Sequence, residues 1–327
     1  MTDTPFVRPD VARFLAFLND APGPRMHELD PPAARAMTRA ARAVADLDRG
    51  EIAVVRDTAC PGPAGDLPLR LYDMREARLP GPVVLFFHGG GFVIGDLDSH
   101  DAACAEIARM LDLPVVAVDY RLAPEAAWPA APDDCEAAAR FVASGAMAGV
   151  KPTGLVFIGD SAGGNLCIVT ALALRDAPAA VPVLAQFPLY PLTDTNTRRP
   201  SLDLFAEGYF LTRDGMRWFD RAYAADNAHV RTSPMLADQA GMPPTLVLTA
   251  GLDPLRDQGR AYAAQLIEAG VPTVFREAVG NIHGFLTMRR AIPSSQGDLA
   301  GALVALKAMI VEAEATAVMA QAAGAGA

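Results

Sequence analysis

The stretch that decides the fold is Gly159-Asp160-Ser161-Ala162-Gly163. It lies between an apolar run at 155–158 and a run of helix formers at 165–175. A strand followed by G-x-S-x-G and then by a helix is typical of a nucleophile elbow, a tight turn that exposes a serine hydroxyl at a helix N-terminus. The two glycines would leave room for the neighbouring backbone. An ordinary glycine-rich turn matches the same five residues, so the rest of the chain has to distinguish the two.

Apolar runs and helical segments alternate along most of the chain. The run at 83–87 is continuously apolar, as expected for a strand that is buried on both faces. Alternation of this kind predicts a parallel sheet with helices on both faces. The expected strands are 52–56, 67–72, 83–87, 115–118, 155–158, 181–187, 244–250 and 273–277. A helix that Asp98-Ser99 would cap is expected to run to Leu111, and the later helices are expected at 132–144, 165–175, 258–269 and 298–316.

Two segments interrupt this alternation and predict a cap over the sheet. Two helices precede the first strand, the second of them starting at Asp30-Pro31, a cap residue followed by proline. The stretch 190–233 is rich in aromatic residues and lacks the strand–helix rhythm, although a long surface insertion would look the same. The predicted organisation is N-terminal cap helices at 1–50, an α/β core at 51–189 and 234–316, a cap excursion at 190–233, and a frayed tail at 317–327.

Composition narrows the class of protein. The 327 residues include 51% hydrophobic and 20% charged residues and carry a net charge of −10, which argues against nucleic acid and anionic membranes as partners. The four cysteines, Cys60, Cys104, Cys135 and Cys167, form no C-x-x-C pair and are interpreted as free thiols in a reducing compartment. The N-terminus lacks the apolar stretch of a signal peptide and no apolar run could cross a bilayer, so we expect a cytoplasmic protein without stable membrane insertion.

A serine nucleophile needs a histidine base that a carboxylate orients. In this architecture the chain order is serine, acid, histidine, and the active residues follow the carboxyl ends of strands. Only His229 and His283 come after Ser161, and His283 directly follows the last expected strand. His283 is therefore the predicted base.

The acid should follow the preceding strand, which places Asp253 on the right loop. Asp257 is interpreted as the acid that opens the next helix. Asp194, after the strand at 181–187, is the competing candidate.

Backbone donors for a developing oxyanion are expected at Ala162 N–H and in the glycine run after the strand at 83–87. A dinucleotide fingerprint starting at Gly89 fails, because Ile94 stands where glycine is required. His88 is expected to anchor its loop. A metal cluster could be drawn from Asp96, Asp98, His100 and Asp101, but helix capping and solvated loop acids explain these residues, and no metal is predicted.

Together these motifs resemble the hormone-sensitive-lipase-like carboxylesterases, the bacterial family IV α/β-hydrolases of the GDSAG subgroup. The matching stretches, in order, are His88-Gly-Gly-Gly-Phe92, Gly95-Asp96, Asp119-Tyr-Arg-Leu-Ala-Pro-Glu125, Gly159-Asp-Ser-Ala-Gly-Gly-Asn165, Asp253-Pro-Leu-Arg-Asp257 and Ile282-His-Gly-Phe285. The resemblance spans about residues 50 to 290. Departures from it are the lack of a polar residue directly after Glu125 and a tail beyond about 315 without a counterpart.

The resemblance implies an α/β-hydrolase fold with a mostly parallel sheet of about eight strands and a helical cap. It implies a serine esterase for short to medium acyl esters that needs no cofactor, with Ser161, Asp253 and His283 as its triad. Gly90 and Gly91 would be the oxyanion donors beside Ala162. Arg121 and Glu125 would brace the loop after the fourth strand.

Two other functions use the same residues: an amide or formamide hydrolase with the same triad, and a non-catalytic receptor, which would be expected to lack a triad member. The expected partner is a small-molecule ester, and the sequence does not decide between a monomer and a homodimer. Six residues are candidates for an apolar substrate pocket, although each is equally consistent with the core: Phe92, Tyr190, Phe205, Phe210, Leu255 and Phe285.

Overall fold

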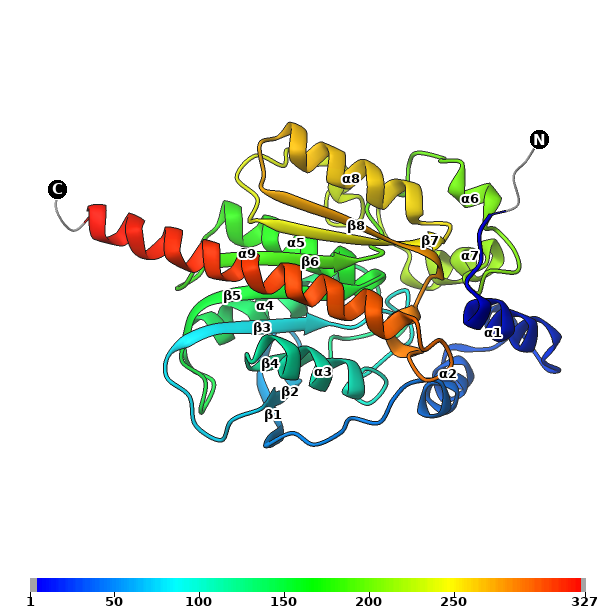
Figure 1. Ribbon diagram of the computed structural model, residues 1–327, viewed down its shortest axis with the longest axis horizontal. Coiled ribbons are helices and arrows are strands. Elements are labelled where there is room, and N and C mark those ends of the chain that lie inside the picture. The colour runs from blue at the N-terminus through cyan, green and yellow to red at the C-terminus, as the bar shows by residue number, and fades with distance from the viewer. Residues whose placement is uncertain (1–4, 325–327) are drawn as a thin grey trace.

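A computed structural model describes residues 5–324, and its centre is an eight-stranded sheet in the order β1-β2-β4-β3-β5-β6-β7-β8 (Figure 1). The strands are β1 (Val54–Gly62), β2 (Gly65–Asp73), β3 (Gly81–Phe87), β4 (Val115–Val118), β5 (Pro152–Asp160), β6 (Val183–Leu189), β7 (Thr245–Leu252) and β8 (Thr273–Ile282). Strand β2 is antiparallel to β1 and to β4, and the other pairings are parallel. The expected mostly parallel sheet is confirmed.

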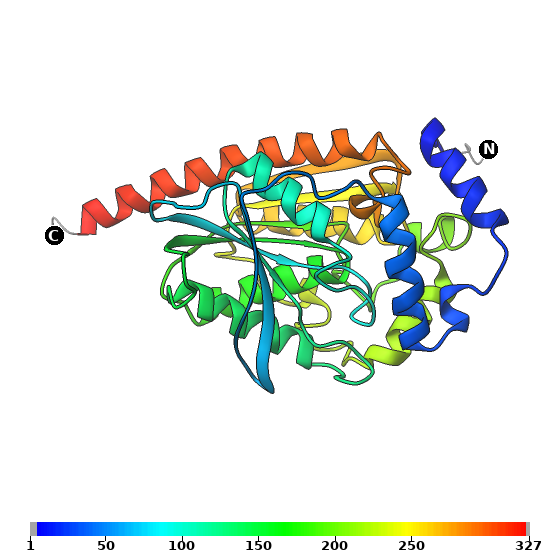
Figure 2. The ribbon, with the colours of Figure 1, turned by 90° about the horizontal axis from the view of Figure 1, so that it is seen from below.

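Helices cover both faces of the sheet, as the alternating pattern predicted. In Figure 2, α3 and α9 lie on one side of the sheet and α4 and α5 on the other. Successive residues of β3 point to opposite faces, so Leu85 packs in the core cluster with residues of α4, α5 and α8, and Phe86 packs in the cluster with residues of α3 and α9. These helices are α3 (Asp101–Leu111), α4 (Ala130–Ala143), α5 (Ala162–Asp176), α8 (Arg256–Glu268) and α9 (Ser295–Gly324).

The N-terminal helices and the 190–233 excursion lie side by side at one end of the molecule. Figure 1 shows α1 (Pro9–Asp20), α2 (Pro31–Ala45), α6 (Ser201–Leu204) and α7 (Arg213–Tyr223) at this end, toward which the parallel strands point. Trp218 Nε1 in α7 donates to Leu29 O at 3.2 Å, and Asn19 Nδ2 donates to Gly208 O at 3.2 Å. Two segments far apart in sequence therefore meet over the carboxyl edge of the sheet.

Helix α2 begins and ends on polar contacts. Asp30 caps it by accepting from Ala33 N–H at 2.8 Å, ahead of Pro31, as the sequence indicated. At its C-terminal end the buried Asp46 accepts from Arg289 Nε at 2.9 Å and Nη2 at 3.1 Å. Ala34 is the buried residue of this helix, so polar contacts carry much of its attachment to the core.

Two boundary predictions are corrected. The residue that precedes α3 at its N-cap is His100 and not the expected Asp98-Ser99, because Asp96 and Ser99 close a turn on each other first. The frayed tail predicted from 317 is wrong as far as Gly324, since α9 continues through this stretch. Its alanine-rich composition has a high helix propensity. Residues 325–327 lie outside the described residues.

Among residues 5–324, every helix is too short or too polar to traverse a lipid bilayer.

Candidate active site

The nucleophile elbow joins β5 to α5, and Ser161 occupies its tip. The serine backbone has φ 56° and ψ −116°, which L-residues rarely adopt and which is typical of a strained functional turn. A Cβ at Gly159 would overlap the carbonyl oxygen of Gly163, and a Cβ at Gly163 would overlap that of Phe87. Only glycine fits at either position, so the tight turn requires both of these residues.

Three residues from three strand ends meet at this elbow. His283, which follows β8, has its Nε2 2.8 Å from Ser161 Oγ and its Nδ1 2.7 Å from Asp253 Oδ2. Asp253 follows β7 and is fully buried. A carboxylate can only accept, so it fixes the proton on Nδ1 and leaves Nε2 as an acceptor for the serine hydroxyl.

The competing residues make other contacts. Asp194 accepts from Thr197 N–H and pairs with Arg199 at 3.3 Å. Asp257 accepts from the backbone N–H of Ser201 at 2.9 Å at the start of α8. His229 lies in the excursion against the ring of Trp128.

The glycine run after β3 forms a tight loop beside the elbow. Gly90 and Gly91 have φ of 123° and 58°, and Gly90 O accepts from the N–H groups of Val93 and Ile94, both at 3.0 Å. Within residues 5–324, the N–H groups of Gly90, Gly91 and Ala162 donate to no protein acceptor. Ala162 is the first residue of α5, where the N–H groups lack helical partners.

His88 anchors this loop, as predicted. Its Nδ1 lies 2.9 Å from Gly89 O, and its ring stacks on Tyr120 with 4.2 Å between centroids. Burial and the neighbouring His100 lower the pKa of His88 to about 3, so it stays neutral. The two braces that the resemblance implied are present: Arg121 pairs with Asp134 at 2.7 Å, and Glu125 pairs with Arg35 at 2.6 Å.

Two aromatic rings of the excursion border the site. Phe210 lies beside Gly284, the residue after His283, and Phe219 of α7 lies so close to Gly91 that a Cβ there would overlap its ring. Phe210 adopts φ 74° and is 38% exposed. Phe219 was not among the residues expected to line a pocket.

Of the six residues that were expected either to line a pocket or to belong to the core, all except Phe210 are buried. The rings of Phe92, Phe205 and Phe285 are buried in hydrophobic clusters, and Phe92 stacks on Tyr223 at 3.9 Å. Tyr190 is also buried, with its ring centroid 4.8 Å from that of His283. Leu255 is buried on the loop of the triad aspartate. Periodicity and composition do not distinguish a core phenylalanine from one that lines a cavity.

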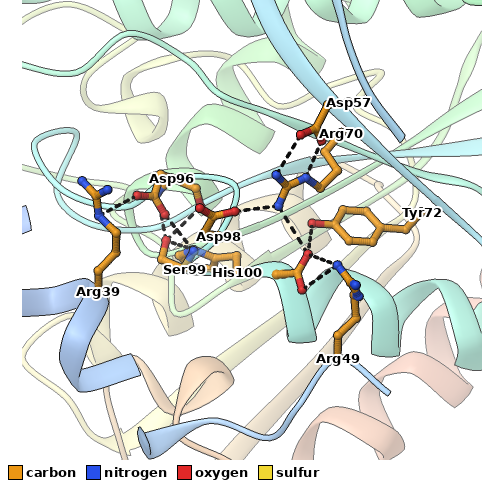
Figure 3. A network of polar contacts seen from close by, with 10 residues as sticks. Arg39, Arg49, Asp57, Arg70, Tyr72, Asp96, Asp98, Ser99 and His100 are labelled. Atoms are coloured by element: carbon orange, nitrogen blue, oxygen red, sulfur yellow. Dashed lines mark hydrogen bonds and ion pairs between the residues drawn. The ribbon is translucent and has the colours of Figure 1, made fainter. Parts of the chain in front are cut away.

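The residues that could be drawn as a metal cluster make hydrogen bonds and ion pairs with other protein side chains (Figure 3). Asp98 pairs with Arg70 at 2.8 Å, and Asp101 accepts from Tyr72 OH at 2.9 Å. Asp96 pairs with Arg39 at 3.2 Å, and His100 turns inward to Asp160. The three aspartates are therefore held by arginine or tyrosine side chains, and His100 is a buried hydrogen-bonding group.

Sequence reasoning assigned no role to Asp160, and it indicated Tyr190 only as a pocket or core residue. Asp160 is buried, and its Oδ1 accepts from Gly89 N–H at 2.7 Å. Tyr190 OH donates to Asp160 Oδ2 and accepts from Leu286 N–H, both at 3.3 Å. The position of Asp160 at the end of a buried strand, directly before the serine, was the available signal.

A serine, a histidine and an aspartate in hydrogen-bond contact at a strained elbow, on a mostly parallel sheet, define an α/β hydrolase. The chain belongs to this family: residues 84–287 match the family described as alpha/beta hydrolase fold.

Several of its relatives are named as ester hydrolases. The carboxylic ester hydrolase LipN of Mycobacterium tuberculosis is 41% identical over 72% of this chain and 65% of its own length. The ethyl acetate hydrolase of Pseudomonas putida is 39% identical over 74% of this chain and 78% of its own. The structure of an ester hydrolase from the metagenome of Lake Arreo covers 92% of this chain and 98% of its own, with a TM-score of 0.87 and 37% identity. The resemblance to the hormone-sensitive-lipase-like carboxylesterases is thus confirmed, and the chain is a serine hydrolase of carboxylic esters; the amide alternative is not favoured.

Proposed function

We propose that Ser161, His283 and Asp253 form the catalytic triad of a carboxylesterase that acts on short- to medium-chain acyl esters. The observation that carries this proposal is the continuous contact of 2.8 Å and 2.7 Å between groups from three separate strand ends. A complete triad also argues against a receptor that has lost its catalytic function.

The reaction follows from this geometry. Ser161 Oγ attacks the acyl carbon while its proton passes to His283 Nε2, and Asp253 stabilises the imidazolium that forms. The N–H groups of Gly90, Gly91 and Ala162 hold the oxyanion of the tetrahedral intermediate. His283 then protonates the leaving alcohol. A water that gives its proton to His283 releases the acid from the acyl-enzyme.

The rings of Phe210 and Phe219 support a preference for short acyl chains, because they border the site on its histidine and oxyanion sides. The name of the Pseudomonas putida relative, an ethyl acetate hydrolase, agrees with a short acyl group. A series of p-nitrophenyl esters should show kcat/KM falling beyond an acyl length of roughly eight carbons. Equal rates with two and with sixteen carbons would refute this preference.

Replacement of the nucleophile tests the triad. Ser161→Ala is expected to lower kcat for p-nitrophenyl butyrate by about 10⁴-fold or more, because the covalent route is lost. Ser144→Ala, at an exposed serine after α4, is the matched control and should keep the parent rate. A Ser161→Ala protein that cleaves the ester as fast as the parent would refute the proposal.

We also propose a reducing, cytoplasmic location. Its support is that all four cysteines are buried and unbridged. Burial raises the pKa of the Cys60 thiol to about 11, so this thiol stays protonated and unreactive.

A further inference from the structure

Helix α2 of the N-terminal segment holds the loop that follows the oxyanion glycines. Arg35 Nε donates to Val93 O at 2.8 Å, two residues beyond Gly91, and its Nη2 donates to Ala123 O at 2.8 Å. Both oxygens of Glu125 keep the same guanidinium in place, at 2.9 and 2.6 Å. A bidentate pair fixes the orientation of an arginine as well as its position.

A second arginine lies two turns further along the same face of α2. Nη1 of Arg42 is 2.9 Å from Nδ1 and 3.0 Å from Nε2 of His100. His100 is fully buried, and its Nε2 lies 3.1 Å from Asp160 Oδ1. Burial and the charge of Arg42 lower the pKa of His100, so a neutral ring donates from Nε2 to Asp160.

Asp160 links this contact to the glycine loop. The oxygen that faces His100 also accepts from Gly89 N–H at 2.7 Å, next to Gly90. Burial alone raises the pKa of a carboxyl, but His100, Arg42 and the Gly89 N–H hold the pKa of Asp160 below its ordinary value. A buried carboxylate needs a nearby cation to stay ionised, and Arg42 supplies that charge.

We propose that Arg42 is a positioning residue for the oxyanion hole, acting through His100 and Asp160 on Gly89, while Arg35 holds the other end of the glycine loop at Val93. Oxyanion donors stabilise the transition state only when they are aimed at the developing charge, and a misplacement of about 1 Å can cost roughly 100-fold in rate. The N-terminal helix thus sets the geometry of the catalytic centre as well as covering it.

This inference rests on the proposed function, and two substitutions at Arg42 test it. Arg42→Gln should lower kcat for p-nitrophenyl butyrate about 10- to 100-fold and leave KM within about twofold, because the misaimed donors act on the transition state and not on the bound ester. Arg42→Lys keeps the charge beside His100 and should recover most of the lost rate. Arg39→Gln is the control on the same helix: Arg39 is 56% exposed and pairs with Asp96 at 3.2 Å, so its kcat should stay within about twofold of the parent.

A transition-state analogue distinguishes misplaced oxyanion donors from a general loss of folded protein. A trifluoromethyl ketone forms a tetrahedral oxyanion on Ser161, so its Ki should rise in Arg42→Gln by the same factor by which kcat/KM falls. If Arg42→Gln fails to fold, Arg35→Lys decides, since one ammonium nitrogen cannot reproduce the contacts that three guanidinium nitrogens make with Val93 O, Ala123 O and both oxygens of Glu125; kcat should fall several-fold with KM unchanged.

Unchanged kcat and Ki in Arg42→Gln and Arg35→Lys would overturn the inference. So would an activity loss that matches the loss of folded protein measured by near-UV circular dichroism. A parent enzyme that hydrolyses no ester would instead refute the proposed function.

Discussion

At the scale of single residues, the hydrogen bonds of Asp253 fix the tautomer of His283. Asp253 is fully buried and accepts from both His283 Nδ1 and Leu255 N–H, at 2.7 and 2.8 Å. It holds the imidazole in the tautomer whose Nε2 faces Ser161. An amide in its place can present an N–H to Nδ1 and thus favour the wrong tautomer.

Asp253→Asn is therefore expected to leave the fold intact and to lower kcat by about 10⁴-fold. Asp194→Asn, at the competing position in the sequence, should change kcat by no more than about threefold, since Asp194 pairs with Arg199 away from the triad. Steady-state kinetics with p-nitrophenyl butyrate measures both. A larger loss of kcat in Asp194→Asn than in Asp253→Asn would contradict the assignment of Asp253 as the acid of the triad.

At the scale of secondary-structure elements, the active site depends on how α2 is attached. The helix contributes little apolar burial, and its contacts with the core are arginine–carbonyl bonds and ion pairs. At its C-terminal end, Arg289 is 1% exposed and pairs with Asp46. Nearby, Arg290 pairs with Asp48, which is 93% exposed.

These two ion pairs should differ sharply in their contribution to stability. Asp46→Asn leaves a buried guanidinium without a counter-charge and should lower the free energy of unfolding by about 3 kcal/mol. Asp48→Asn removes an exposed pair and should change it by less than about 0.5 kcal/mol. Urea denaturation followed by circular dichroism measures both. Equal effects would contradict the assignment of Asp46 as the buried anchor.

At the scale of the whole molecule, the net charge of −10 coexists with many local arginine–carboxylate pairs. Where a half-buried carboxyl lies among other carboxylates, its ionisation lowers the free energy of unfolding. Burial, together with the charges of Asp96 and Asp98, raises the pKa of Asp119 to about 6. Because the folded state binds this proton more tightly than the unfolded state, its ionisation reduces stability as the pH rises from about 4 to 6.

Asp119→Asn should accordingly raise the free energy of unfolding at pH 8 by about 1 kcal/mol, a figure discounted for the partial exposure of the carboxyl. The gain should shrink between pH 6 and 4 and vanish below that range, where both states of the parent are protonated. Thermal denaturation at pH 8 and pH 4 tests this, with Asp48→Asn as a control that should show no such trend. A variant less stable than the parent at pH 8 would contradict the expected cost of ionisation.

The sequence by itself determined the sheet, the elbow and the three residues that meet there. Alternating apolar runs dictate strands and helices, the steric demands at Gly159 and Gly163 admit no other residue, and chain order leaves His283 as the histidine after the last strand. Each of these signals is local, or follows from the order of elements.

Only the tertiary structure decided which phenylalanines are core, that Phe219 lies against Gly91, and that Arg42 reaches Asp160 through His100. The physical reason is that these contacts join residues tens to more than a hundred positions apart, whose side-chain directions depend on how α2 and α7 pack. Residue spacing does not encode that packing. The end of α9 has a local cause instead: the alanine-rich sequence favours helix, and α9 continues to Gly324, past the tail boundary expected at 317.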